Sequence, residues 1–293
     1  MPTLTVESFD PELSALEFLQ QRIPAAPRAF LRQLLKTGKV SGESGPFAEQ
    51  DKLAAGTIVH LPDSGRVREL LNAPLPASKQ VDVLFESREI LVADKPAGLA
   101  VHASLGHEQD NLTARVRALL AERNEHFKIA PAHRLDLGTS GPVIYGKGQK
   151  ACGELGRLLM RDDVEKRYLA LVLGKTAGSG DVRTTLPAKG KRKEARTAFR
   201  ALSRTEQASL LELTLHSGRQ HQIRRQFAEL GHPLFGDRRY GGPCPAALTR
   251  TFLHCRQLVF PDPYSGATVV INSPLPGELE AYLSEIGLGD VPL

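Results

Sequence analysis

The sequence predicts an α+β protein built in two parts. Segments with strand character outnumber helical ones in the longer part and rarely alternate with them, which favours an α+β sheet over a doubly wound parallel one. The shorter part comes first and holds two amphipathic segments with clustered bases, and a stretch rich in Pro, Ala and Ser follows it. We therefore expect a small basic domain over residues 1–62, a linker over 63–80 and a larger domain over 81–293.

The bulk composition is that of a globular protein with material for a sizeable core. Of 293 residues, 41% are hydrophobic and 24% are charged. No apolar run has the length of a membrane span and the first residues lack a signal-peptide pattern, so we expect a cytoplasmic protein with no membrane partner. The three cysteines lie far apart, which argues against a disulfide framework or a structural zinc site. A net charge of +5 permits a polyanionic partner without requiring one.

The small domain is expected to hold two short helices. Apolar residues at helical spacing predict the first helix over residues 11–23, and Pro24 ends it. A second amphipathic helix is predicted over 26–36, with its leucines facing a core. A turn with a short strand over 37–42 and a strand over 58–61 complete this part.

A basic face accompanies the second helix. Arg28, Arg32 and Lys36 recur four residues apart and share a side of the helix, and Lys39 follows in the next turn. Such a face is either simply solvated or lies on phosphates. With two short helices, a glycine turn and a closing strand, the region resembles the αL-type RNA-binding module of ribosomal small-subunit proteins. That resemblance implies that the four bases contact RNA.

The larger domain is predicted to be rich in strands, with residues 174–190 as a loop. The predicted strands are 83–86, 90–94, 142–145, 166–173, 195–202, 209–215 and 269–271. The predicted helices are 111–123, 150–160 and 222–230. Asn111 is expected to cap the first of these helices.

Polar residues that a core does not need gather in four segments of the larger domain. They are His133-Arg-Leu-Asp136, Lys166-Arg-Tyr168, the run 215–225 and the run 236–242. Asp136 stands before a Gly-Thr-Ser-Gly turn, whose small residues let another molecule approach the backbone. A carboxylate held this way can act as a nucleophile, a base or an ion-pair partner, although it can also be an ordinary turn residue. The run 215–225 joins a strand to a helix and carries arginines and histidines, which suit an anion.

Other chemistries lack their sequence patterns. The histidine pairs His102/His107 and His216/His221 are five residues apart, whereas two ligands on one helix face are four apart, so we expect no metal. The Gly-x-Ser-x-Gly elbow of serine hydrolases is absent. The phosphate-binding Gly-x4-Gly-Lys-Ser/Thr loop is absent as well, which disfavours an ATPase or GTPase.

The polar segments, taken in order, resemble the motifs of the RluA-type pseudouridine synthases. Besides the segment that ends at Asp136, the matching stretches are 94–102, 166–168, 217–224 and 231–241. The resemblance implies a mixed, mainly antiparallel sheet with flanking helices and a central cleft with Asp136 at its floor. It also implies the conversion of uridine in RNA into pseudouridine without a cofactor or a metal.

The resemblance assigns catalytic roles to three residues. Asp136 aligns with the essential aspartate of the family, and Arg224 aligns with the arginine that pairs with it. Tyr168 aligns with the active-site tyrosine, which can stack on uracil and take part in proton transfer.

The resemblance also assigns contacts with RNA. Arg134 matches a position implicated in holding a flipped-out nucleotide. His133, Arg219 and His221 are expected to line the cleft and touch RNA. Large-subunit ribosomal RNA is the expected substrate of a monomeric enzyme, and transfer RNA is the second candidate. The alternative is a non-catalytic RNA-binding or ribosome-assembly protein on the same fold.

Overall fold

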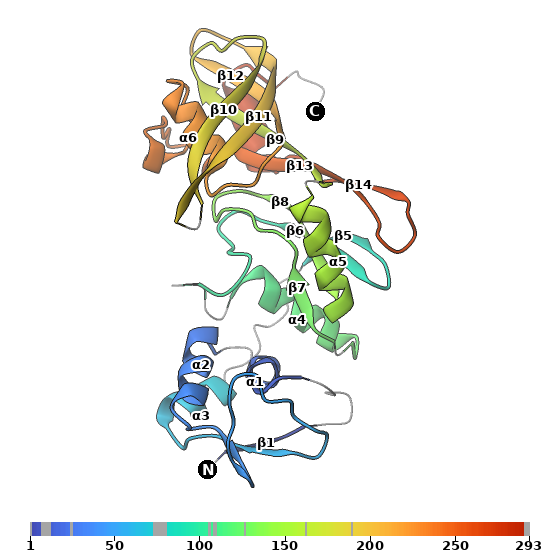
Figure 1. The fold of residues 1–293 in the computed structure, drawn as a ribbon. Helices are drawn as coiled ribbons and strands as arrows, with labels where there is room; N and C mark the ends of the chain where they lie inside the picture. Colours follow the sequence, from blue (N-terminus) through green and yellow to red (C-terminus); the bar gives the residue numbers. More distant parts are fainter. Residues whose placement is uncertain are drawn as a thin grey trace. The chain divides into compact units, whose positions relative to one another are not determined.

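The computed structural model describes residues 2–6, 13–23, 26–72, 81–104, 107, 110–125, 127–161, 163–188 and 190–289. The chain divides into two compact units. Unit 1 comprises residues 1–81 and 102–128, and unit 2 comprises residues 82–101 and 129–293. Both contain antiparallel sheets and helices (Figure 1), which confirms the α+β class. Among the described residues, no helix combines the length and the apolar character needed to cross a bilayer.

Unit 1 contains a four-stranded sheet in the order β1-β4-β2-β3. Its strands are β1 (Thr3–Thr5), β2 (Ser41–Gly42), β3 (Gly45–Pro46) and β4 (Ile58–His60), and its helices are α1 (Ala15–Arg22), α2 (Arg28–Lys36), α3 (Gly65–Asn72) and α4 (Leu112–Glu122). The leucines of α2 are buried as its periodicity predicts. Its basic side is exposed.

Helix α1 begins at a capping box. The Ser14 hydroxyl accepts the backbone N–H of Glu17 at 3.3 Å, and the Glu17 carboxylate accepts the Ser14 N–H at 3.1 Å. Glu17 also accepts a hydrogen bond from Lys128, which ties α1 to a residue 111 positions further along the chain. Residues 11 and 12 of the predicted helix lie outside the described residues.

The segment expected to be a linker is structured over its first half. Residues 65–72 form α3, whose Val67 and Leu70 belong to the core of unit 1. The remainder, 73–80, lies outside the described residues. Helix α4, expected in the larger domain, groups with unit 1, and its predicted cap is present because the Asn111 side chain accepts the Ala114 N–H at 3.0 Å.

Unit 2 contains two antiparallel sheets, with orders β10-β11-β12-β9-β13-β14 and β5-β6-β8-β7. The strands are β5 (Asp82–Glu86), β6 (Ile90–Lys95), β7 (Ile129–Pro131), β8 (Gly141–Lys147), β9 (Glu165–Leu173), β10 (Ser179–Ala188), β11 (Lys191–Arg204), β12 (Ala208–Leu215), β13 (Leu253–Pro261) and β14 (Thr268–Asn272). The helices are α5 (Gln149–Met160), α6 (Gln222–Glu229), α7 (Gly277–Glu285) and the short 3-10 helix η1 (Arg238–Tyr240). The strand ladders are antiparallel, which agrees with the mainly antiparallel sheet expected for this part, and the bridge between Ser140 and His254 is a parallel pairing.

The loop predicted over 174–190 is wrong for most of its length. Strand β10 pairs with β11 from Ser179–Arg200 to Ala188–Lys191 and forms a long hairpin at the edge of the larger sheet. An edge strand buries little, and here Val182 and Leu186 are the apolar side chains that become buried. The residues between Val182 and Leu186 are mostly polar, so the sequence of β10 lacks the apolar pattern that predicts a strand.

The two sheets of unit 2 meet where β8 runs beside β13. The Cys255 N–H donates to the Ser140 carbonyl at 2.8 Å. Gly141 has φ +125°, and a Cβ at this position would lie 2.3 Å from the Cys255 carbonyl oxygen. The neighbouring strand thus requires glycine at position 141.

Candidate active site

Asp136 lies in the turn between β7 and β8, next to the junction of the two sheets. The turn is closed by the Thr139 N–H, which donates to the Asp136 carbonyl at 3.0 Å. The following residue, Leu137, accepts the Gly98 N–H at 2.8 Å, which binds the turn to the loop after β6. The side chain of Asp136 is 18% exposed, so its carboxylate is held in the protein but can be reached from solvent.

Helix α6 brings two nitrogen groups to Asp136. Arg224 Nη1 lies 3.7 Å from Asp136 Oδ2, and His221 Nε2 lies 3.8 Å from Oδ1. Both distances exceed those of a hydrogen bond, so the contacts are electrostatic and leave room for adjustment when a substrate binds. The structure therefore brings together two segments that sequence reasoning singled out separately.

The tight partner of Arg224 is Asp237. Arg224 Nε and Nη2 bind the two Asp237 oxygens at 2.6 and 2.7 Å in a bidentate pair, and the Asp237 side chain is 1% exposed. Burial alone would lower the pKa of Arg224, but the hydrogen bonds and charge of Asp237 and the charge of Asp136 raise it overall. Asp237 stands in the fourth polar segment, yet its role as an anchor for Arg224 was not predicted.

Position 221 begins α6 with an unusual backbone. His221 has φ +54°, in the left-handed region that non-glycine residues seldom adopt. Burial lowers the pKa of its imidazole, and the nearby arginines add to this effect, whereas Asp136 opposes it. The ring is thus predominantly neutral at physiological pH.

Two glutamines fasten α6 to the hairpin sheet. The Gln222 side chain accepts the Ser217 hydroxyl at 2.8 Å and donates to the Arg196 carbonyl at 3.0 Å. Gln226, one turn later and fully buried, accepts the Thr197 hydroxyl at 2.6 Å. The hydrogen-bonding groups of Gln222 are therefore used inside the protein, where they orient the helix that carries Arg224.

Tyr168 lies on β9, buried between β12 and β13. Burial raises the pKa of its phenol, as do the neighbouring Cys255 and the charge of Asp136. The phenol therefore keeps its proton at neutral pH and can donate it in a hydrogen bond, whereas it is a poor base.

Two buried cations on the inner side of the turn were not predicted. Lys95 is 1% exposed, and its ammonium group donates to the carbonyls of Pro96 and Leu99, both at 2.8 Å. Burial and the charge of Arg250 lower the pKa of Lys95 to about 7, and Asp136 opposes this. Arg250 Nη2 donates to the Ser140 hydroxyl at 2.8 Å, four residues after Asp136. The one hint in the sequence was the position of Lys95 within a polar motif.

The residues expected to contact RNA in unit 2 occupy different settings. Arg134 and Arg219 are exposed or nearly so, and Arg219 lies near the Glu194 carbonyl at 3.4 Å. His133 Nε2 accepts the Ile144 N–H at 3.2 Å. Burial and Lys166 lower the pKa of His133 to about 3, so it stays neutral and cannot attract phosphate as a cation. Its observed role is to fix the turn to β8.

The four bases expected to bind RNA in the small domain are all exposed on α2 and the turn after it: Arg28, Arg32, Lys36 and Lys39. Arg32 Nε binds the Glu49 carboxylate at 2.9 Å, so part of the positive charge of Arg32 is neutralised within the protein. These residues belong to unit 1.

Comparison with known proteins identifies relatives of this site. The family described as RNA pseudouridylate synthase matches residues 89–229, a range that includes Asp136, Tyr168 and Arg224. Ribosomal large subunit pseudouridine synthase C of Pasteurella multocida is 30% identical over 92% of this chain and 89% of its own length. Ribosomal large subunit pseudouridine synthase D of Nitrosomonas europaea is 36% identical, over 70% of this chain and 64% of its own length.

Solved structures show the same fold. Human RNA pseudouridylate synthase domain containing 4 has a TM-score of 0.60 at 22% identity, over 70% of this chain and 92% of that structure. Human RNA pseudouridylate synthase domain containing 1 has a TM-score of 0.56, also at 22% identity, over 68% of this chain and 85% of that structure.

Proposed function

This chain belongs to the RluA-type family of RNA pseudouridine synthases, which are isomerases, and from that premise we propose that it converts specific uridines of structured RNA into pseudouridine with Asp136 as the essential residue. The observation that carries the proposal is the partly exposed Asp136 carboxylate beside Arg224, together with a buried Tyr168 on which the charge of Asp136 acts. Pure RNA binding does not need a carboxylate facing a phosphate chain, because the two repel each other.

The proposed reaction rearranges one nucleotide. The bond between N1 of uracil and C1′ of ribose breaks, the base turns, and C5 forms a new bond to C1′. The proton from C5 is lost and N1 gains one, so atoms balance without a co-reactant. Asp136 acts as the nucleophile or the base that enables these steps, with the Arg224 guanidinium 3.7 Å from its carboxylate.

The target uridine has to leave its stack to reach Asp136. Extruding a base from structured RNA costs a few kcal/mol. We assign Arg134, exposed and two residues before Asp136, to holding the extruded conformation. Tyr168, with its retained phenol proton, is assigned to packing on the base and to proton transfer.

Asp136→Asn tests the catalytic assignment. The amide keeps the size of the side chain but can neither attack nor take a proton, so we expect no detectable pseudouridine in an in vitro large-subunit ribosomal RNA transcript. RNA affinity should remain within about three-fold, because Asp136 itself binds no phosphate. Asp181→Asn, an exposed aspartate of the same unit, is the control. Full activity of Asp136→Asn would remove Asp136 from the mechanism.

Tyr168→Phe separates stacking from proton transfer. The ring and its packing remain while the hydroxyl is removed, so turnover should fall by about 10²-fold with KM little changed. Single-turnover kinetics on the same transcript measure this. Unaltered kinetics would leave Tyr168 only its packing role.

We further propose large-subunit ribosomal RNA as the substrate. This rests on the two relatives named as ribosomal large subunit synthases. Mapping pseudouridine in total RNA with and without the gene should reveal the loss of sites in large-subunit RNA. Loss confined to transfer RNA would redirect the assignment to that substrate.

The basic face of α2 is proposed as an additional surface that binds RNA. Deleting residues 1–62 would remove most of the core of unit 1, so substitutions make the cleaner test. Replacing Arg28, Arg32 and Lys36 by Gln should weaken binding and reduce the slope of log K against log salt by roughly 0.7–0.9 for each phosphate that the protein no longer neutralises. If the substituted protein has the same salt slope as the wild-type protein, this face does not bind phosphates.

A further inference from the structure

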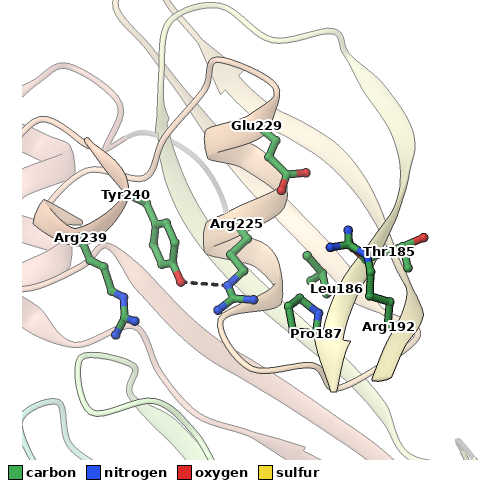
Figure 2. A pocket seen from close by; sticks show the side chains of 8 residues that line it. All are labelled: Thr185, Leu186, Pro187, Arg192, Arg225, Glu229, Arg239 and Tyr240. Carbon is green, nitrogen blue, oxygen red and sulfur yellow. Dashed lines mark hydrogen bonds between the residues drawn. The ribbon is translucent and has the colours of Figure 1, made fainter. Parts of the chain in front are cut away.

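A pocket of about 420 Å³ lies beside the candidate active site, between the β10–β11 hairpin and α6 (Figure 2). Its walls come from three places: β10 and β11 on one side, α6 in the middle and η1 on the other. The residues are Thr185, Leu186, Pro187, Arg192, Arg225, Glu229, Arg239 and Tyr240. None of these was among the residues expected to bind RNA.

The pocket carries an excess of positive charge. Its lining includes three guanidinium groups, from Arg192, Arg225 and Arg239, and one carboxylate, from Glu229. Arg225 uses its Nε to bind the Tyr240 hydroxyl at 2.9 Å, and Arg192 uses Nη2 to bind the Thr185 carbonyl at 2.6 Å. The remaining N–H groups of both side chains are placed for an anion, and planar guanidinium groups bind phosphate oxygens well.

The surroundings favour an RNA strand over a small free anion. Leu186 and Pro187 give the pocket an apolar wall against which a ribose or a base can pack. Beside Arg192, the exposed Lys191 and Lys193 extend the positive charge along the tip of the hairpin. A chain of phosphates matches such an extended basic surface, whereas a single ion would not need it.

Tyr240 connects this pocket to Asp136. Its hydroxyl binds Arg225 on the pocket side and His221 Nδ1, at 2.9 Å, on the other. Arg224 lies over its ring, with 5.1 Å between the guanidinium carbon and the ring centre. His221 and Arg224 are the two groups whose nitrogens lie within 4 Å of the Asp136 carboxylate among the described residues.

The chemistry of these contacts orients His221. A guanidinium only donates, so the Tyr240 oxygen accepts from Arg225 and can donate its own hydrogen to His221 Nδ1. A neutral imidazole then carries its proton on Nε2, the atom that faces Asp136. Tyr240 is thereby a positioning residue that acts through His221 and Arg224.

We propose that this pocket binds a backbone phosphate of the substrate RNA at a nucleotide adjacent to the target uridine, and that Tyr240 couples its occupation to the position of the groups around Asp136. The proposal rests on the proposed function, since it takes the RNA substrate from there. It adds a subsite of the substrate strand, held by Arg192, Arg225 and Arg239.

Arg192→Gln tests the phosphate contact while leaving in place Arg225 and His221, the hydrogen-bond partners of the Tyr240 hydroxyl. On a large-subunit ribosomal RNA transcript, we expect KM to rise about ten-fold while kcat changes less than about three-fold. The slope of log K against log salt should fall by roughly 0.7–0.9, as expected when one phosphate fewer is neutralised. Arg88→Gln, which removes an equal charge from a side chain 93% exposed on the β5–β6 turn, is the control. Equal behaviour of the two variants would overturn the proposal.

Tyr240→Phe tests the coupling. It keeps the ring under Arg224 and removes the hydroxyl between Arg225 and His221, so kcat should fall at least about five-fold while the salt slope stays unchanged. Unchanged kcat would overturn the positioning role of Tyr240.

Ethylation interference identifies the bound group. Ethylating one phosphate next to the target uridine should weaken binding to the wild-type protein more than it weakens binding to Arg192→Gln, which has lost one of the three arginines of the pocket. Interference that is the same for both proteins would exclude a phosphate in the pocket. The salt slope and the ethylation interference are binding measurements, so they test the pocket even if the wild-type protein forms no pseudouridine. A lack of pseudouridine formation would count against the proposed function alone.

Discussion

The buried pair between Asp237 and Arg224 offers a sharp test of how the site is held. Asp237→Asn preserves the shape of the side chain but removes its charge and one of its two acceptor oxygens. The Arg224 guanidinium then loses one of its two hydrogen bonds at 2.6 and 2.7 Å together with the charge of its partner, and the nearby Asp136 carboxylate is 3.7 Å away. Both stability and catalysis should suffer.

The size of the effect follows from burial. The side chains of Asp237 and Arg224 are 1% and 13% exposed, so water cannot replace the missing interaction. Breaking a buried pair on one side costs about 3–5 kcal/mol, and the conservative change to Asn should lie near 3 kcal/mol. For a domain of this size class, about 3 kcal/mol corresponds to a fall of roughly 6–12 °C in Tm.

Asp181→Asn is the matched control. Asp181 binds Arg196 at 2.6 Å in the same unit, but these side chains are 34% and 43% exposed. Water and salt screen such a pair, so its removal should leave Tm unchanged within error. Calorimetric melting of both variants makes the comparison, and a double-mutant cycle of Asp237→Asn with Arg224→Gln isolates the pair. Equal melting of the two aspartate variants, or no coupling in the cycle, would refute the reasoning.

Three further outcomes are expected from unfolding measurements. Gly141→Ala should lower the free energy of unfolding by at least about 2 kcal/mol more than Gly148→Ala does. Both glycines have positive φ, but only a Cβ at position 141 would lie 2.3 Å from the Cys255 carbonyl oxygen. Equal losses in urea unfolding would contradict this. Burial lowers the pKa of Lys95 to about 7 from 10.5, so unfolding takes up a proton between these values, and stability should rise with pH across that window relative to Lys95→Met. A pH-independent difference between the two proteins would show that the pKa of Lys95 is not lowered. Burial raises the pKa of Glu17, but its hydrogen bonds to Lys128 and Ser14 outweigh burial and lower the pKa to about 2 from 4.5. The ionised Glu17 therefore stabilises the fold fully above pH 4.5. In thermal melts, the higher Tm of the wild-type protein over Glu17→Gln should disappear as the pH falls toward 2.

Much of the candidate site was visible in the sequence because its chemistry is local. Asp136, Tyr168 and Arg224 stood out as polar residues at strand ends and a helix start, where a core has no use for them. The structure places all three in unit 2, with Arg224 at the carboxylate and Tyr168 close enough for the charge of Asp136 to act on it. The apolar side of α2 was likewise evident from periodicity alone.

Other features escaped because they depend on what lies next to them. Strand β10 is polar and lies at an edge of its sheet, so its composition does not predict a strand. Its pairing with β11 in the structure establishes that it is one. Helix α3 was hidden by the surrounding Pro and Ser, although Val67 and Leu70 reach the core. Lys95 read as an ordinary basic residue until its burial became apparent.

The sequence by itself determined the α+β class, the family motifs and the residues that we propose as catalytic. Only the tertiary structure decided how their charges are paired: that Arg224 is anchored by Asp237, that Tyr240 stands between the basic pocket and His221, and that Gly141 serves the junction of two sheets. The physical reason is that residue type and periodicity are properties of neighbouring positions, whereas electrostatic and hydrogen-bond energies depend on distances in space. Those distances are set by sheets and helices that come from segments far apart in the chain.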